Sequence, residues 1–484
     1  MRCTIAPIEG ALAWLIRIAG AALTRAWRHG AHHLRRCLER TVGTSRLLAD
    51  EIGYRGARNG RGPDREASLC FAAILAGPMT TSSARPVLRR CLIFNPAFPV
   101  LGGGERYTIA LGSVIAESHN VTYAAPYRPD PDLVARLGFP PLDIMKLDVD
   151  DFPRLSVEYD LAVVVTTLSI PPPSFAAKSL LVVQFPRGTL PDHPAHRWLT
   201  IAKLRRYERI VYSHYVLEWL RQRWKVNGRV LMPGVPLVDD LQRPKERLIL
   251  AVGRFVGRFA DGWNNKRQDV LIDAFSQLPR HLQDTWHLVL AGGCSPSPEM
   301  EEFLEALKRQ ANGLNISFEI NVPAARLADL QERARLFWHA AGFDRPSTEP
   351  ERAEHFGMST VEAMSHGVIP LVYADGGQVE IVNEEFGRLW HSIPQLVEQT
   401  TQLMMQSPTE LDATATAARR ASLLYGAARF EGEARELLGT ASGPDTGPTR
   451  RPWAARLDQR WRRTLCGAYE MARRVGRASA RAPS

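Results

Sequence analysis

Two glutamates eight residues apart, Glu354 and Glu362, lie on either side of a Phe-Gly turn in the segment Glu-His-Phe-Gly-Met-Ser-Thr-Val-Glu. The turn predicts the start of a helix, where unpaired backbone N–H groups and a partial positive charge favour phosphate. A carboxylate before the turn can reach a sugar hydroxyl, and a carboxylate one turn into the helix can reach a ribose. The spacing therefore suits a ligand in which sugar, diphosphate and ribose lie in line, which is a nucleotide sugar.

The same residues have a structural interpretation. Ser359 and Glu362 have the spacing of a capping box, in which a serine and a glutamate three residues later satisfy N–H groups at the helix start. For an isolated Ser-x-x-Glu pattern this interpretation would usually be correct. Here the pattern lies inside a longer motif and in the order strand, turn, helix, which favours ligand binding.

A second motif supplies two cations. Arg254 follows a predicted strand over 247–252, and Lys266 precedes an amphipathic helix predicted over 268–278. A departing nucleoside diphosphate accumulates negative charge, and cations held in place stabilise that charge. Isolated surface cations would carry no such role, but the sequence around these two favours it.

Four weaker features have competing interpretations. A glycine run, 102–104, follows the first predicted strand and can bring the backbone close to a ligand, although a flexible turn is the usual meaning of such a run. It does not fit the dinucleotide pattern, which argues against a Rossmann oxidoreductase. The loop 374–380 is either a tight turn or a flank of the sugar site. The acidic cluster 148–151 is better explained as a solvated turn than as a metal site, and Trp338 and His339 as packing residues.

Residues 90–435 resemble the retaining glycosyltransferases of family 4, which have the GT-B fold; the match is most specific over 339–382 and 250–275. The resemblance implies a catalytic group, a donor site and an acceptor contact, with no cofactor and no metal. The catalytic group is Glu354, Arg254 and Lys266; the donor site is Gly103, Gly104, Val322, His355, Phe356, Gly357, Met358, Ser359 and Glu362; and the acceptor contact is Gln184. Related enzymes often have a histidine where Gln184 stands, and glutamine can bond a hydroxyl but cannot titrate near neutral pH.

The resemblance further implies transfer of a hexose from a nucleotide sugar to a glycan or lipid-linked acceptor, with retention at the anomeric carbon. The segment around the glutamate pair is similar to mannosyltransferases of lipid-linked glycan assembly. This similarity favours GDP-mannose over UDP-hexoses and places the expected role in envelope polysaccharide or glycolipid synthesis. The alternative is a membrane-tethered scaffold protein that binds nucleotide sugars without turnover. The presence of all four charged residues of the two motifs, Glu354, Glu362, Arg254 and Lys266, counts against it.

Short apolar runs alternate with helical stretches through the body of the chain, which predicts α/β architecture with two parallel sheets facing a central cleft. The pattern restarts after 233–244. We therefore expect four parts: a basic extension with an amphipathic helix and linker (1–86), an acceptor domain (87–240), a donor domain (241–438) and a basic amphipathic tail that forms a second helix (439–484). A mistaken start codon or a fused remnant would explain 1–86 equally well.

Charge separates the ends from the body. Residues 1–90 hold 15 Lys/Arg against 6 Asp/Glu and residues 449–484 hold 10 against 2, which leaves 36 against 43 for the body. This distribution fits ends that meet an anionic membrane surface, or solvated arginine tails, and argues against a nucleic-acid groove across the body. Six scattered cysteines favour a reducing compartment. Arg17 interrupts the apolar run from Ala11 to Leu23, which argues against a secretory signal. We expect a cytoplasmic protein, peripheral on the inner face of the cell membrane.

Overall fold

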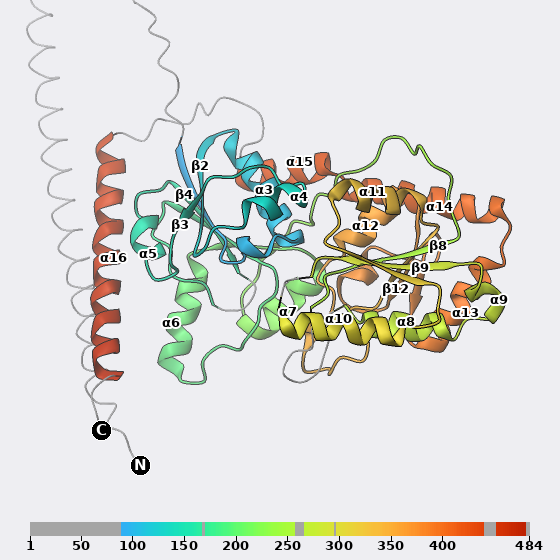
Figure 1. Ribbon diagram of the computed structural model, residues 1–484. Helices are drawn as coiled ribbons and strands as arrows, with labels where there is room; N and C mark the ends of the chain where they lie inside the picture. Colours follow the sequence, from blue (N-terminus) through green and yellow to red (C-terminus); the bar gives the residue numbers. More distant parts are fainter. Residues whose placement is uncertain (1–88, 167–169, 257–265, 295–296, 440–451, 481–484) are drawn as a thin grey trace, which may run out of the picture. The chain divides into compact units, whose positions relative to one another are not determined.

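The computed structural model describes residues 89–484 apart from 167–169, 257–265, 295–296, 440–451 and 481–484 (Figure 1). The predicted amino-terminal extension, with its amphipathic helix and linker, lies outside the described residues. All the described residues belong to one compact unit, which begins at Pro86.

The first sheet has seven parallel strands in the order β3-β2-β1-β4-β5-β6-β7. The strands are β1 (Arg89–Phe94), β2 (His119–Ala125), β3 (Ile144–Lys146), β4 (Leu161–Thr166), β5 (Lys178–Val183), β6 (Glu208–Val211) and β7 (Arg229–Val230). The helices are η1 (Phe98–Val100), α3 (Gly103–Ala116), α4 (Pro131–Arg136), α5 (Phe152–Ser156), α6 (Pro194–Arg205) and α7 (His214–Trp224). Because the strand order reverses between β1 and β4, the loop after β1 lies where such sheets bind ligands.

The second sheet has six parallel strands in the order β10-β9-β8-β11-β12-β13. The strands are β8 (Leu248–Val252), β9 (His287–Gly292), β10 (Ile316–Ile320), β11 (Leu336–His339), β12 (Ile369–Tyr373) and β13 (Arg388–Trp390). The helices within this part are α8 (Gln268–Ser276), α9 (Arg280–Gln283), α10 (Pro298–Gln310), α11 (Ala324–Arg333), η2 (Pro350–Arg352), α12 (Met358–Ser365), η3 (Gly376–Glu380) and α13 (Ile393–Met404). Figure 1 shows α8 and α10 on one face of this sheet and α11 and α12 on the other. The order reverses between β8 and β11, which both end near the predicted site.

Both sheets have the predicted parallel α/β architecture. Strand β4 is buried at all six positions, as expected for a strand covered by helices on both faces. The sequence pattern missed β3 and β13, which are three-residue strands at sheet edges. An edge strand has a single neighbour, so its sequence needs little apolar character.

Three further helices follow the second sheet: α14 (Pro408–Ser422), η4 (Leu423–Tyr425) and α15 (Ala427–Leu438). Helix α15 returns to the first half of the molecule and packs on α3, where the rings of Phe430 and Tyr107 lie 5.3 Å apart. Arg435 on α15 forms an ion pair with Glu117 at 2.6 Å. The two halves are therefore joined by a helix as well as by the linker between the sheets.

The tail forms a helix, α16 (Pro452–Ala480), as predicted. Part of it packs on the first half: Cys466 is buried in a small cluster with Val157 and Phe175. Arg462 donates to the carbonyl oxygens of Val157 at 2.9 Å and Phe175 at 3.2 Å. At least one arginine of the tail therefore anchors the helix to the protein itself. Within the described ranges, no helix combines the length and apolar character needed to cross a bilayer.

Candidate functional site

Three polar side chains, those of Lys266, Glu354 and His339, converge at the carboxyl edge of the second sheet. Lys266 Nζ lies 2.5 Å from Glu354 Oε2, and His339 Nε2 lies 3.1 Å from the same oxygen. Lys266 immediately precedes the short turn into α8, His339 ends β11, and Glu354 lies in the loop before α12. A cation, an imidazole and a carboxylate thus come together from different elements. Lys266 is 88 positions from Glu354 in the sequence, and His339 is 15 positions from it.

The carboxylate of Glu354 is held in its ionised form. Burial by itself would raise the pKa of Glu354, but the charge of Lys266 and the hydrogen bond from His339 bring it well below the ordinary value. Burial lowers the pKa of His339, which is 3% exposed, so the imidazole is neutral at neutral pH. A neutral imidazole can donate from Nε2 to the carboxylate only in the tautomer with hydrogen on that nitrogen.

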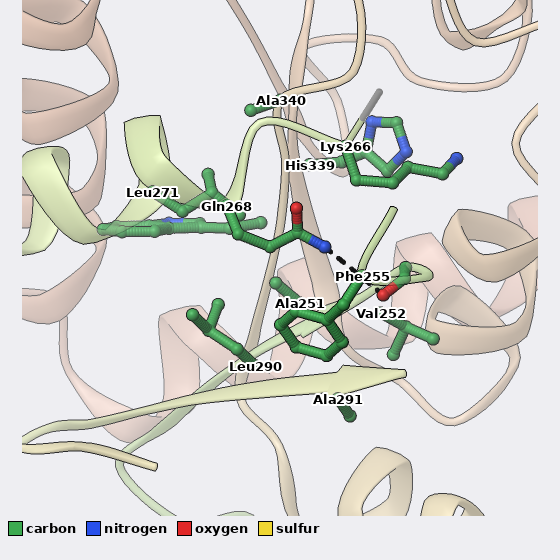
Figure 2. A pocket seen from close by; sticks show the side chains of 12 residues that line it. Ala251, Val252, Phe255, Lys266, Gln268, Leu271, Leu290, Ala291, His339 and Ala340 are labelled. Carbon is green, nitrogen blue, oxygen red and sulfur yellow. Dashed lines mark hydrogen bonds between the residues drawn. The ribbon is translucent and has the colours of Figure 1, made fainter. Parts of the chain in front are cut away.

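A small pocket lies beside this cluster, with an empty volume of about 260 Å³ that includes space open to solvent. Figure 2 shows the side chains of Lys266 and His339 together at one end, and Gln268 reaching across toward the loop after β8. The Gln268 amide donates to the carbonyl oxygen of Arg254 at 3.2 Å. The pocket is walled by the ends of β8, β9 and β11, the place where open α/β sheets bind ligands.

Helix α12 begins without a side-chain cap, which shows that the capping-box interpretation was wrong. Gly357 is the N-cap, with φ of 117°, and it has no side chain that could bond the N–H groups of the first turn. Ser359 is already the second residue of the helix and cannot act as its cap. A side chain at Gly357 would meet Gln378 Oε1 at 2.9 Å and would also require a disfavoured backbone conformation. The helix start therefore has the uncapped N–H groups that an anion site requires.

The glycine run meets the same helix start from the other half of the molecule. A Cβ at Gly103 would lie 2.9 Å from Met358 Sδ, and a Cβ at Gly104 would lie 2.1 Å from Gln184 Nε2. Gln184 is 9% exposed, and its Nε2 has no partner among the described residues. The starts of α3 and α12 thus approach each other, with the buried side chain of Gln184 beside them. A side chain at Gly104 would have to displace the Gln184 amide, whereas one at Gly103 would only have to move the flexible end of Met358.

The predicted cation Arg254 is exposed and lies next to the glycine run. Its guanidinium carbon is 3.9 Å from the position a Cβ would take at Gly102. Glu105, on the first turn of α3, accepts from the Gly102 N–H at 2.7 Å; burial raises the pKa of its carboxyl, and the charge of Arg254 acts against this rise. Arg254 is therefore near the start of α3 as well as the second sheet.

Four other residues predicted to bind the donor lie outside the cluster of Lys266, Glu354 and His339. His355 stacks on Phe185 with ring centroids 4.6 Å apart, and burial lowers its pKa to about 4. Phe356 is 2% exposed in the core, so only its backbone is available to a ligand. Burial raises the pKa of Glu362 on α12, and the charge of Arg106 opposes this rise. Val322 follows β10, at the same edge of the second sheet.

Two polar residues of the site escaped the sequence interpretation. His339 was expected to be a packing residue, yet it contacts the Glu354 carboxylate; its position at the last residue of a predicted strand was the available signal. Gln378 is fully buried and donates from Nε2 to Thr360 Oγ1 at 3.0 Å, which fixes the start of α12. Nothing in its sequence surroundings indicated this role. Across the described ranges, no group of three or more His, Cys, Asp or Glu is arranged to hold a metal ion.

The loop 376–377 supports the glutamate directly, which yields a testable prediction. Gly376 has φ of 67°, and a Cβ there would lie 2.1 Å from the carbonyl oxygen of Glu354. Gly376→Ala must therefore displace the backbone that carries the carboxylate. We expect it to lower the melting temperature and to reduce turnover of any bound donor at least about tenfold, since small misplacements of reacting groups are costly.

The matched control for this substitution is Gly432→Ala on α15, where a Cβ meets nothing within 4 Å. Alanine is the better helix former by about 1 kcal/mol, so this variant should be as stable as the parent protein or more stable. Thermal unfolding and donor turnover measured on both variants check the prediction. Equal behaviour of the two variants would contradict it.

Comparisons with known proteins relate the part of the chain that contains the second sheet to a family. Residues 239–420 match the family model described as glycosyl transferases group 1, so this part of the chain is a glycosyltransferase group 1 domain. A glycogen synthase from Deinococcus deserti is 30% identical over 185 residues, 38% of this chain and 36% of that protein. A Caenorhabditis elegans GDP-Man:Man(3)GlcNAc(2)-PP-Dol alpha-1,2-mannosyltransferase is 29% identical over 186 residues, 36% of this chain and 37% of that protein. The chain thus spans just over a third of the length of these curated relatives.

A solved structure extends the likeness to the first sheet. Anabaena HepE in complex with UDP and glucose superposes with a TM-score of 0.54 at 18% identity, covering 72% of this chain and 100% of that chain. At this identity the likeness concerns the fold. The two Rossmann-like halves therefore have the GT-B arrangement that the sequence predicted.

Proposed function

We propose that this protein is a retaining glycosyltransferase of the family 4 type that transfers a hexose from a nucleoside diphosphate sugar to a glycan or lipid-linked acceptor. The observation that carries the proposal is the cluster of Lys266, Glu354 and His339 beside the uncapped start of α12. It combines an ionised carboxylate for sugar hydroxyls with a cation and backbone N–H groups for a diphosphate. The glycosyltransferase group 1 match over 239–420 supports the same activity.

In this proposal the protein positions the donor and stabilises the leaving group. Glu354 binds hydroxyls of the donor sugar, the N–H groups of 357–359 bind the diphosphate, and Glu362 binds the ribose. Arg254 and Lys266 stabilise the charge that develops as the nucleoside diphosphate departs. The acceptor attacks on the same face of the sugar, and the departing phosphate takes its proton. No metal or cofactor has a part in this scheme.

We assign Gln184 to the acceptor side. Its buried, unpaired Nε2 beside Gly104 is a donor for a sugar hydroxyl. Since an unpaired buried donor is costly, a bound hydroxyl would relieve that cost. We propose a lipid-linked or envelope-polysaccharide acceptor, with the enzyme peripheral on the inner face of the cell membrane, on the strength of the basic ends of the chain.

GDP-mannose is the favoured donor in this proposal. The basis is the similarity of the segment around the glutamate pair to mannosyltransferases, and the mannosyltransferase relative adds support. The relative named glycogen synthase and the UDP complex of HepE keep UDP-hexoses as the second choice.

A donor hydrolysis screen tests the function. The full chain is incubated with GDP-mannose, GDP-glucose, UDP-glucose, UDP-galactose and UDP-N-acetylglucosamine, and the released nucleoside diphosphate is measured. We expect release from GDP-mannose above the others. Binding without release from every donor would support the non-catalytic scaffold instead, and the absence of both binding and release would overturn the proposal.

A further inference from the structure

The start of helix α7, in the first half of the molecule, is bonded to a carboxylate from the second half. Glu380 Oε2 accepts from the backbone N–H of His214 at 3.0 Å, and Oε1 accepts from the N–H of Tyr215 at 2.7 Å. The Glu380 side chain is 16% exposed. A carboxylate that accepts two N–H groups at a helix start gains from charge-assisted bonds and from the helix dipole. Glu380 therefore strongly links two segments that are far apart in the sequence, 166 positions from His214 and 165 from Tyr215.

A second link reaches the backbone next to the candidate catalytic glutamate. Ser213, the N-cap of α7, donates from Oγ to the carbonyl oxygen of His355 at 2.6 Å. The same Oγ accepts from the N–H of Val216 at 3.2 Å. The hydroxyl therefore caps the helix and at the same time bonds the other half of the molecule. Ser213 is fully buried. The residue after Glu354 is thus fixed from the opposite half of the molecule.

The two links meet in one loop. Gly377, three residues before Glu380, donates its N–H to the carbonyl oxygen of Glu354 at 2.7 Å. The loop 377–380 therefore binds the backbone of Glu354 at one end and α7 at the other. Farther along α7, Arg223 forms an ion pair with Glu351 at 3.0 Å, which adds to the same interface. The position of the Glu354 backbone depends on contacts that only the joined halves can make.

We propose that Glu380 and Ser213 are positioning residues that hold the segment 354–355 in place across the two halves of the molecule. This latch, defined as Glu380, Ser213 and the backbone groups they bind, gives the loop 374–380 a role other than flanking the sugar. Its effect on turnover rests on the proposed function. Its effect on the position of the segment 354–355 does not rest on the proposed function, because the contacts are made within the protein.

The test compares Glu380→Gln with Glu385→Gln, an exposed glutamate on the same stretch of chain. The neutral amide keeps the size of the carboxylate but has a single acceptor oxygen and no charge. For Glu380→Gln we expect faster hydrogen exchange in α7 residues 214–216 and in residues 353–358, measured by mass spectrometry. We also expect a fall in kcat for donor hydrolysis of roughly tenfold, the scale of one lost charge-assisted bond. The control should match the parent protein in both measurements.

Ser213→Gly provides an independent variant. Glycine is nearly as good an N-cap as serine, so α7 keeps its start while the donor to His355 is lost. Exchange should again rise in 353–358, and kcat should fall with little change in the melting temperature. A purely structural role would instead lower the melting temperature and leave kcat unchanged for the folded fraction.

The outcomes separate the latch from the proposed function. Unchanged hydrogen exchange in 353–358 for both variants would overturn the latch. If the parent protein hydrolyses donor, a kcat equal to that of the parent in both variants would also overturn it. If the parent protein hydrolyses no donor, the proposed function fails. The exchange measurement then still decides whether the latch exists.

Discussion

Replacing Lys266 with alanine is expected to reduce donor turnover about a hundredfold or more, the scale seen when a preorganised group that stabilises developing charge is removed. The Lys266 ammonium lies 2.5 Å from Glu354, and both side chains are less than a quarter exposed. The variant therefore loses a cation for the diphosphate and also leaves the carboxylate without its cationic partner. Removing one member of a buried pair costs about 3–5 kcal/mol, so a lower melting temperature should accompany the loss.

Lys308→Ala is the matched control for this prediction. Lys308 lies on α10 and pairs with Glu305 at 2.8 Å, but both side chains are about half exposed. Exposed pairs contribute at most about 1 kcal/mol, so turnover and melting temperature should stay near those of the parent protein. Steady-state hydrolysis of the best donor, with kcat and KM determined separately, checks the expectation. Near-normal kcat in Lys266→Ala would remove Lys266 from the catalytic group.

The second large effect is expected for Glu354→Gln, which should also lower donor turnover about a hundredfold. The amide has nearly the same shape as the carboxylate, so packing around the loop is preserved. It lacks the charge that Lys266 and His339 face, and it accepts weaker hydrogen bonds from sugar hydroxyls. Glu398→Gln on the exposed face of α13 is the control and should leave turnover unchanged. Retention of normal kcat by Glu354→Gln would rule out the assigned role.

The pH dependence of stability gives a separate measurement on the same variant. The folded-state pKa of Glu354 is depressed below the ordinary value of 4.5. Its contribution to stability is therefore fully present above about pH 4.5 and is lost as the pH falls toward the folded-state pKa. Glu354→Gln should be less stable than the parent protein at neutral pH, and the difference should narrow in acid. Urea unfolding at pH 7 and at pH 4 measures this narrowing.

The amino-acid sequence was sufficient to predict the architecture, and it singled out two of the charged residues that the structure brings together. Short buried runs alternating with helical periodicity specify parallel strands with crossover helices, since both patterns record burial along the chain. Local motifs also identified Glu354 and Lys266, because each stands at a fixed offset from a strand end or a helix start. Whether these two residues bind a donor remains a prediction.

Only the tertiary structure decided which groups from distant segments meet. The contacts of Glu354 with His339, of Gly104 with Gln184, and of Glu380 with the start of α7 join residues of different elements, and no periodicity encodes such pairs. The uncapped start of α12 is a similar case, because the spacing of Ser359 and Glu362 fits a capping box that the backbone does not form. A local pattern fixes what an element can do, whereas the packing of elements fixes what each side chain faces.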